Sequence, residues 1–194
     1  MAGSHQGGFV SYPLEYPALG LLMDGPRHGY RLYQDFNGAL RGIWKAGQAK
    51  FYAALASLET GGLLDSQEEP QQGRPPRRVY TITPEGRAEF LAWLHAPVPS
   101  LRAIRVELIG KLRFFDLLDL PGAHTLVDRQ VALLENMLAE WAELSVEQGL
   151  SDADPFPALT DDFRRRQAHF LIDWLRAWRD RLPDAPARPT ALTS

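Results

Sequence analysis

The sequence contains no cysteine, which excludes disulfide frameworks and thiolate metal sites and suits a reducing cytosol. No run of apolar residues approaches the length needed to span a bilayer. Residues 1–10 also lack the basic start and apolar stretch of a signal peptide. We therefore expect a cytoplasmic protein with no membrane partner.

Signatures of catalysis are missing as well. The five histidines, His5, His28, His95, His124 and His169, show no paired metal-ligand spacing. There is no Gly-x-Ser-x-Gly elbow and no phosphate-binding loop. We expect no enzyme, no catalytic residue, no metal and no cofactor. The net charge of −3 also lacks the basic excess of a typical nucleic-acid binder, so charge must be read locally.

Hydrophobic periodicity predicts the elements of the first half of the chain. Apolar residues recur at helical spacing over residues 17–24, 28–36, 47–60 and 84–95. Residues 63–69 and 77–82 are predicted as the two arms of a hairpin, joined by a polar segment around Gly73. The predicted order is therefore three helices, a hairpin and a fourth helix.

The second half is predicted to be wholly helical. After the hinge-like break Pro97-Val98-Pro99, helices are expected over residues 101–119, 123–148 and 159–182. The last of these carries an apolar stripe, namely Phe163, Phe170, Leu171, Trp174 and Trp178. The fold class is mainly α with a small β-hairpin. The expected domains are a winged helix-turn-helix over 14–96 and an all-α dimerisation domain over 100–182, with flexible tails at 1–13 and 183–194.

The segment from Gly73 to Gly86 carries the strongest local signal. It places Arg74, Arg77 and Arg78 on a turn stiffened by prolines, then a short strand, then a helix that Thr83 can cap. Arginine is the usual side chain for gripping phosphates. The segment is typical of a nucleic-acid-binding wing, although a solvated turn with the same residues is the plainer alternative.

The first half resembles the PadR family of transcriptional regulators. The matching residues are Ala18-Leu19-Gly20-Leu21-Leu22, Gly25-Pro26-Arg27-His28-Gly29-Tyr30, Trp44, Tyr52, Leu55, Leu58-Glu59, Gly62-Leu63 and the segment from Gly73 to Gly86. They cover residues 18–94 in order and at similar spacing. The second half resembles the helical dimerisation region of that family in pattern more than in motif.

The resemblance implies a cytoplasmic homodimer that binds a two-fold operator in double-stranded DNA, usually as a repressor. It also implies a response to a small effector, often aromatic or hydrophobic. The alternatives are a winged-helix module for protein contacts, or a ligand sensor, without direct DNA binding.

The exposed face of the predicted recognition helix departs from the family pattern. It carries Ala49, Ala53, Ala56 and Ser57, small side chains that allow close approach to the groove but form few hydrogen bonds with base edges. We therefore expect sparse direct readout. The DNA-binding candidates, expected to contact mainly phosphates, are Lys45, Gln48, Lys50, Tyr52, Arg74, Arg77 and Arg78. Tyr52 as a core aromatic and Lys45 as a solvated side chain remain alternatives.

Three further patterns fall in the second half. A wide apolar band on residues 123–148 predicts dimerisation through Val127, Val131, Leu134, Leu138 and Trp141, unless a self-contained bundle buries it.

Aromatic residues are candidates for an effector pocket, with plain hydrophobic core as the alternative. They are Trp93, Trp141, Phe170, Trp174 and Trp178. Arg164-Arg165-Arg166 is not interpreted as a second nucleic-acid site, since acidic residues of the preceding helix can pair with it.

Overall fold

The computed structural model describes residues 14–71, 74–147 and 155–183. These residues are mainly helical with one small antiparallel sheet, which confirms the predicted fold class. The chain divides into two compact units, Met1–Trp93 and Leu94–Ser194. The division lies inside helix α4, so the domain limits of 14–96 and 100–182 stay predictions. The first tail, and the second from residue 184 onward, lie outside the described residues.

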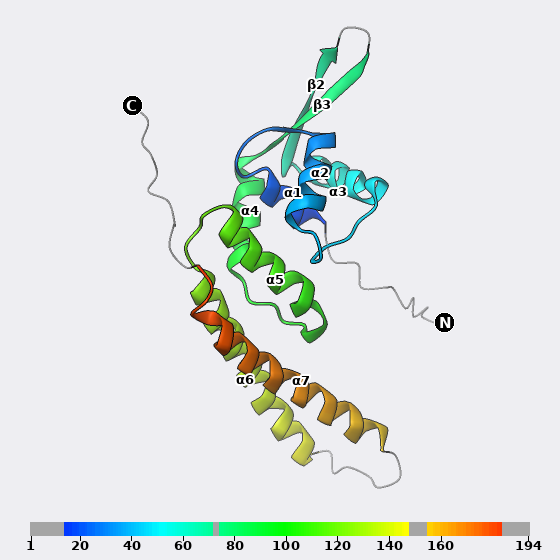
Figure 1. The fold of residues 1–194 in the computed structure, drawn as a ribbon. Helices are drawn as coiled ribbons and strands as arrows, with labels where there is room; N and C mark the ends of the chain where they lie inside the picture. The colour runs from blue at the N-terminus through cyan, green and yellow to red at the C-terminus, as the bar shows by residue number, and fades with distance from the viewer. Residues whose placement is uncertain (1–13, 72–73, 148–154, 184–194) are drawn as a thin grey trace, which may run out of the picture. The chain divides into compact units, whose positions relative to one another are not determined.

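Unit 1 contains four helices and three strands, and Figure 1 shows its long hairpin projecting from the helices. Its elements are α1 (Glu15–Leu21), β1 (Arg27–His28), α2 (Gly29–Ala39), α3 (Gln48–Thr60), β2 (Leu64–Gln71), β3 (Arg74–Ile82) and α4 (Pro84–His95). Each predicted element is present, and β1 is additional.

The core of unit 1 follows from the helical spacing of apolar residues. Leu32 and Phe36 on α2 and Phe51 and Leu55 on α3 are fully buried. The rings of Phe36 and Phe51 lie 4.9 Å apart between centroids, a favourable tilted arrangement. Burial of one face leaves the opposite face of α3 exposed to solvent.

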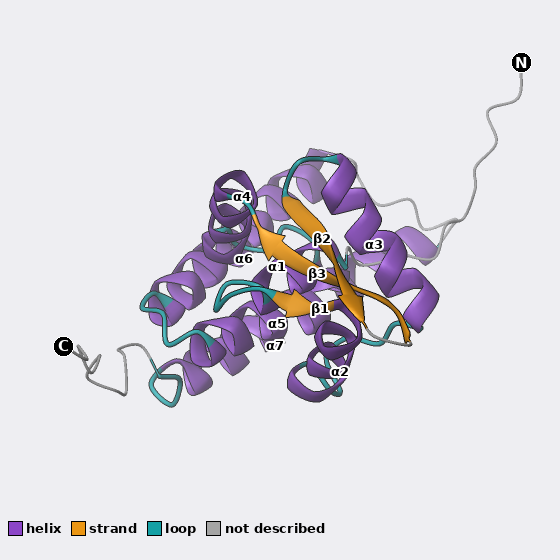
Figure 2. Ribbon diagram, turned by 90° about the horizontal axis from the view of Figure 1, so that it is seen from above, coloured by secondary structure: helices purple, strands orange, loops and turns teal. Residues whose placement is uncertain are grey.

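The sheet has the order β1-β3-β2, and both pairings are antiparallel (Figure 2). Strand β1 is only two residues long, so its sequence carries no alternation from which it could be predicted. It pairs only with Val79 and Tyr80 on β3. Opposite Pro75 and Pro76 the pairing of β3 with β2 is irregular, with a register shift between Glu69 and Gln71. Such an irregularity tolerates proline, which lacks a backbone donor.

A tight junction fixes the hairpin to α4. The Thr83 hydroxyl accepts a hydrogen bond from the backbone N–H of Gly86 at 3.0 Å, so Thr83 caps α4 as predicted. The same hydroxyl donates to the Gly62 carbonyl at 2.9 Å. A Cβ at Gly86 would lie 1.9 Å from the Leu63 carbonyl oxygen, so only glycine fits this position.

Unit 2 contains α5 (Leu101–Leu117), α6 (Ala123–Glu147) and α7 (Phe156–Arg179). Helices α6 and α7 lie side by side as an antiparallel pair (Figure 1). Ion pairs join their exposed edges: Arg179 to Asp128 at 2.6 Å and Arg176 to Glu135 at 2.5 Å.

The predicted hinge at Pro97-Val98-Pro99 is pinned to unit 2. The Gln130 side chain accepts from the Val98 N–H at 2.6 Å and donates to the Val98 carbonyl at 2.9 Å. The buried Lys111 donates to the Ala96 carbonyl at 2.8 Å and pairs with Glu107 at 3.0 Å. Burial lowers the pKa of Lys111. The segment interrupts the helices but is held by α5 and α6.

Helix α7 presents two apolar faces rather than the single predicted stripe. One face, with Ala168, Ile172 and Leu175, is buried. The other face is exposed, with relative accessibilities of 69% for Phe156, 63% for Leu159, 67% for Phe163 and 64% for Phe170. Phe163 and Phe170 therefore belong to a solvent-facing surface of unit 2.

Candidate nucleic-acid interface

Helix α3 presents an outer face made of small side chains. Ala49, Ala53, Ala56 and Ser57 are exposed, whereas Phe51, Ala54, Leu55 and Leu58 are buried. The helical period places these two sets on opposite sides. The outer face is thus a shallow strip that a groove wall could approach closely.

Polar residues gather at the N-terminal end of this strip. Lys45, Gln48 and Lys50 are all exposed. The loop before α3 is fixed by the Tyr33 hydroxyl, which donates to the Ala46 carbonyl at 3.2 Å. Tyr52 is half-buried, with its ring edge-on to Phe51 at 6.4 Å, so part of its phenol stays accessible.

The arginines of the hairpin lie along β3, not at a turn as the sequence suggested. β3 begins at Arg74, whose side chain lies outside the described residues. Arg77 and Arg78 are exposed strand residues, and their cross-strand neighbours on β2 are Glu69 and Glu68. The strand extends through the prolines because its pairing with β2 is irregular opposite them.

Glu59 at the end of α3 connects this helix to both strands of the hairpin. Its carboxylate accepts from the Ser66 hydroxyl at 2.5 Å and pairs with Arg78 at 3.3 Å. The Tyr80 hydroxyl and then the Glu59 carboxylate raise the pKa of Arg78. Burial raises the pKa of Tyr80. Sequence reasoning missed Glu59, since its partners are set by tertiary register.

A cleft of about 400 Å³ opens between the start of α2, the middle of α3 and β3. We call it the α2–wing cleft, and it is lined by His28, Gly29, Tyr30, Arg31, Tyr52, Arg77, Arg78 and Tyr80. It therefore brings together three of the predicted DNA-binding residues: Tyr52, Arg77 and Arg78. None of its lining residues is acidic.

The residues predicted for dimerisation differ in burial. Val127 and Leu134 are 1% and 0% exposed, so they are buried within the chain. Val131, Leu138 and Trp141 are half-buried. Burial within the chain, the alternative to dimerisation, thus accounts for part of the apolar band of α6. The half-buried members of the band stay partly accessible.

The predicted aromatic residues belong to different units and surroundings. In unit 1, Trp93 stacks on Tyr16 at 4.8 Å and lies 6.4 Å from Trp44, within an aromatic cluster. In unit 2, Phe170 and Trp178 are exposed and Trp174 is half-buried.

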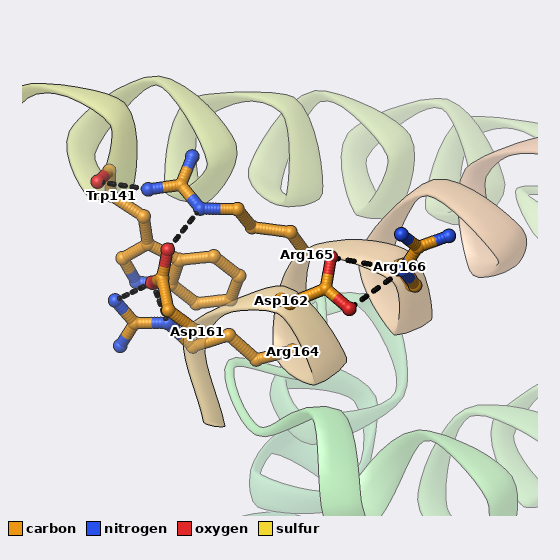
Figure 3. A network of polar contacts seen from close by, with 6 residues as sticks. All are labelled: Trp141, Asp161, Asp162, Arg164, Arg165 and Arg166. Carbon is orange, nitrogen blue, oxygen red and sulfur yellow. Dashed lines mark hydrogen bonds and ion pairs between the residues drawn. The ribbon is translucent and has the colours of Figure 1, made fainter. Parts of the chain in front are cut away.

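The three consecutive arginines of α7 are engaged locally, as Figure 3 shows. Arg164 and Arg165 both pair with Asp161 at 2.5 Å, and Arg166 pairs with Asp162 at 2.7 Å. Arg164 also lies over the Trp141 ring at 4.6 Å, and Arg165 donates to the Trp141 carbonyl. Their carboxylate partners are on α7 itself rather than on α6, which the sequence had suggested.

Residues 18–92 match the model of the transcriptional regulator PadR-like family. Over 161 residues the chain is 27% identical to the negative transcriptional regulator PadR of Bacillus subtilis, covering 82% of this chain and 85% of the relative. It is 29% identical over 89 residues to a probable transcriptional regulator of Mycobacterium tuberculosis, covering 46% of this chain and 47% of the relative.

Solved structures give similar matches. A Bacillus subtilis PadR structure in complex with operator DNA is 24% identical with a TM-score of 0.42, covering 88% of this chain and 99% of that one. A structure of the same regulator with p-coumaric acid is 22% identical with a TM-score of 0.39 and the same coverage. Within the part of the chain described by the structure, no helix is long and apolar enough to cross a membrane, and no cluster of side chains is suited to a metal ion.

Proposed function

We propose that this chain, whose residues 18–92 match the PadR-like family of transcriptional regulators, binds operator DNA through unit 1 and acts as a repressor. The observation that carries this proposal is the small-residue face of α3 lying on the same unit as an arginine-bearing hairpin. The matched family consists of regulators, so the chain is not an enzyme.

Helix α3 enters the major groove and the β2–β3 hairpin acts as the wing on the flanking backbone. Small side chains at Ala49, Ala53 and Ala56 let the helix approach the groove floor and touch thymine methyl groups. Lys45, Gln48 and Lys50 reach phosphates at the N-terminal end of α3, and the wing arginines reach them on the other side. Few side chains then contact base edges, and sequence preference comes largely from the recognition of DNA shape.

The chain binds the two-fold operator as a homodimer. The exposed Phe156, Leu159, Phe163 and Phe170 lie on one side of α7, and their exposure favours burial against a second copy. Val131, Leu138 and Trp141 on α6 supply a further half-buried edge. Two recognition helices then read half-sites about one helical turn, or a multiple of it, apart.

A small aromatic or hydrophobic effector regulates the repressor in the cytoplasm. The candidates for its contacts remain Trp93 in unit 1 and, separately, Trp141, Phe170, Trp174 and Trp178 in unit 2, since indole and phenyl rings bind flat apolar molecules. Titration of aromatic compounds should shift tryptophan emission. An unchanged spectrum across a broad panel would count against such a pocket.

Footprinting of the intergenic DNA beside the gene tests the DNA-binding proposal. We expect a protected site with two-fold symmetry and a gel shift that weakens steeply with salt. A scrambled duplex of equal length is the control. Absence of any sequence-selective band at low salt would instead favour a protein-interaction module or a ligand sensor.

A further inference from the structure

The α2–wing cleft has a floor built from one glycine and two tyrosines. A Cβ at Gly29 would lie 2.9 Å from Cε2 of Tyr80 and 3.0 Å from Cε1 of Tyr52. The same point is 3.3 Å from the Tyr52 hydroxyl. The missing side chain therefore lets the Tyr52 hydroxyl approach the backbone where α2 begins.

Helix α2 adds backbone donors to this floor. It is an eleven-residue helix whose N-cap, His28, makes no side-chain capping hydrogen bond. First-turn N–H groups have no partner inside a helix and carry its partial positive charge. Gly29, Tyr30 and Arg31, the first residues of α2, all line the cleft.

The rim of the cleft is cationic, and its two wing arginines differ. Arg78 is paired with Glu59 at 3.3 Å. Arg77 is exposed and forms no ion pair within residues 14–71, 74–147 and 155–183, although Glu69 is its cross-strand neighbour. Glu69 instead lies 3.8 Å from His28. Arg77 is thus the guanidinium available to an incoming anion.

We propose that the α2–wing cleft is an oxyanion site that seats one phosphate of the DNA backbone between the recognition helix and the wing. Arg77, the Tyr52 hydroxyl and the first-turn N–H groups of α2 are its donors. The inference rests on the proposed DNA binding and identifies the groups of unit 1 that hold one backbone phosphate in each half-site. A dissolved inorganic phosphate presents the same oxygens and occupies the same cleft without DNA.

Operator duplexes that each carry one neutral methylphosphonate linkage provide the first test. At one position in each half-site, the wild-type protein should lose about tenfold in affinity. The same methylphosphonate should lower the operator affinity of Arg77→Gln and of Tyr52→Phe by less than about threefold, each compared with its own affinity for the unmodified duplex. Each variant already lacks part of the contact with that phosphate. Arg41→Gln, an exposed arginine of unit 1 away from the cleft, is the control and should lose the full factor.

Inorganic phosphate provides the second test on the full chain without DNA. Its titration should shift the amide NMR signals of Gly29, Tyr30 and Arg31 in the wild type and in Arg41→Gln, but less in Arg77→Gln. Coupling with the modified duplexes supports the inference, and amide shifts in addition show that the cleft also binds a dissolved anion. If DNA binds without coupling at any position, the inference is overturned, even when inorganic phosphate shifts the amides. Lack of any DNA binding, with the amide shifts present, would overturn the proposed function and leave the oxyanion site standing.

Discussion

Individual glycines mark the places where unit 1 is packed most closely. Gly86 lies against the Leu63 carbonyl, and this contact anchors α4 to the start of the hairpin. Gly29 lies under the rings of Tyr52 and Tyr80 at the floor of the α2–wing cleft. At both positions the absence of a side chain sets the geometry of the wing relative to the helices of unit 1.

Gly86→Ala should lower the free energy of unfolding by about 3 kcal/mol, because the new methyl group would overlap the Leu63 carbonyl oxygen. Chemical denaturation followed by circular dichroism measures this change. Gly38→Ala on α2 is the matched control, since a Cβ there meets nothing within 4 Å and alanine favours the helix. Equal stability of the two variants would show that the junction at Gly86 can relax.

Glu59→Gln should raise DNA affinity about fivefold, because it removes a carboxylate that competes with phosphate for Arg78. Glutamine can still accept the hydrogen bond from Ser66. Fluorescence anisotropy with labelled operator DNA measures the effect. Asp65→Asn on β2 changes the charge equally at an exposed residue opposite Thr81 and should have a smaller effect. A loss of affinity in Glu59→Gln would mean that the ion pair holds the wing in its binding position.

Among the elements, the α6–α7 pair is tied by the polar contacts around Trp141 (Figure 3). Hydrogen bonds from Arg165 and then Arg164 lower the pKa of Asp161 below its ordinary 3.8. This group therefore stabilises the fold above pH 3.8, and its contribution is lost as the pH falls through the lowered value.

Asp161→Asn should cost about 1 kcal/mol of unfolding free energy at neutral pH. The difference from wild type should stay constant down to about pH 4 and shrink at lower pH. Denaturant titrations at several pH values measure it. Asp173→Asn, at an exposed position of the same helix, is the control. A difference that grows in acid would contradict the assignment.

The outer face of α7 carries the proposed dimer contact. Phe170→Glu should weaken self-association at least about tenfold, because it places a charge in an apolar interface. His169→Glu changes the neighbouring exposed residue and serves as the control. Sedimentation equilibrium measures both. An unchanged dimer in Phe170→Glu, with dissociation on Val131→Glu, would move the interface to the edge of α6.

Sequence periodicity predicted the helices and the hairpin because their burial patterns are local. Strand β1 could not be predicted in this way, since a strand of two residues shows no hydrophobic periodicity. The two apolar faces of α7 were merged into one stripe, because spacing alone does not show which face meets α6. The Glu59–Arg78 pair also needed the register between α3 and β3. Among the candidate site residues, the α2–wing cleft brings together Tyr52 from α3 and Arg77 and Arg78 from β3.

For the whole molecule, a net charge of −3 makes the placement of cations decisive. The overall charge does not attract DNA, so we propose that nonspecific attraction comes from the arginines of the hairpin and the lysines near α3. The outer face of α3 offers few groups that distinguish bases. We therefore propose that affinity and sequence preference come from different parts of unit 1.

The salt dependence of binding to operator and scrambled DNA tests this separation most directly, with wild type compared with an Arg77→Gln, Arg78→Gln double variant. We predict that both duplexes lose affinity by the same factor in the variant. The plot of log K against log salt has a negative slope, and its magnitude should decrease by about 0.9 for each lost phosphate contact. A variant that loses operator affinity while its scrambled-DNA affinity and salt slope stay unchanged would show that these arginines read bases, contradicting their role as phosphate anchors.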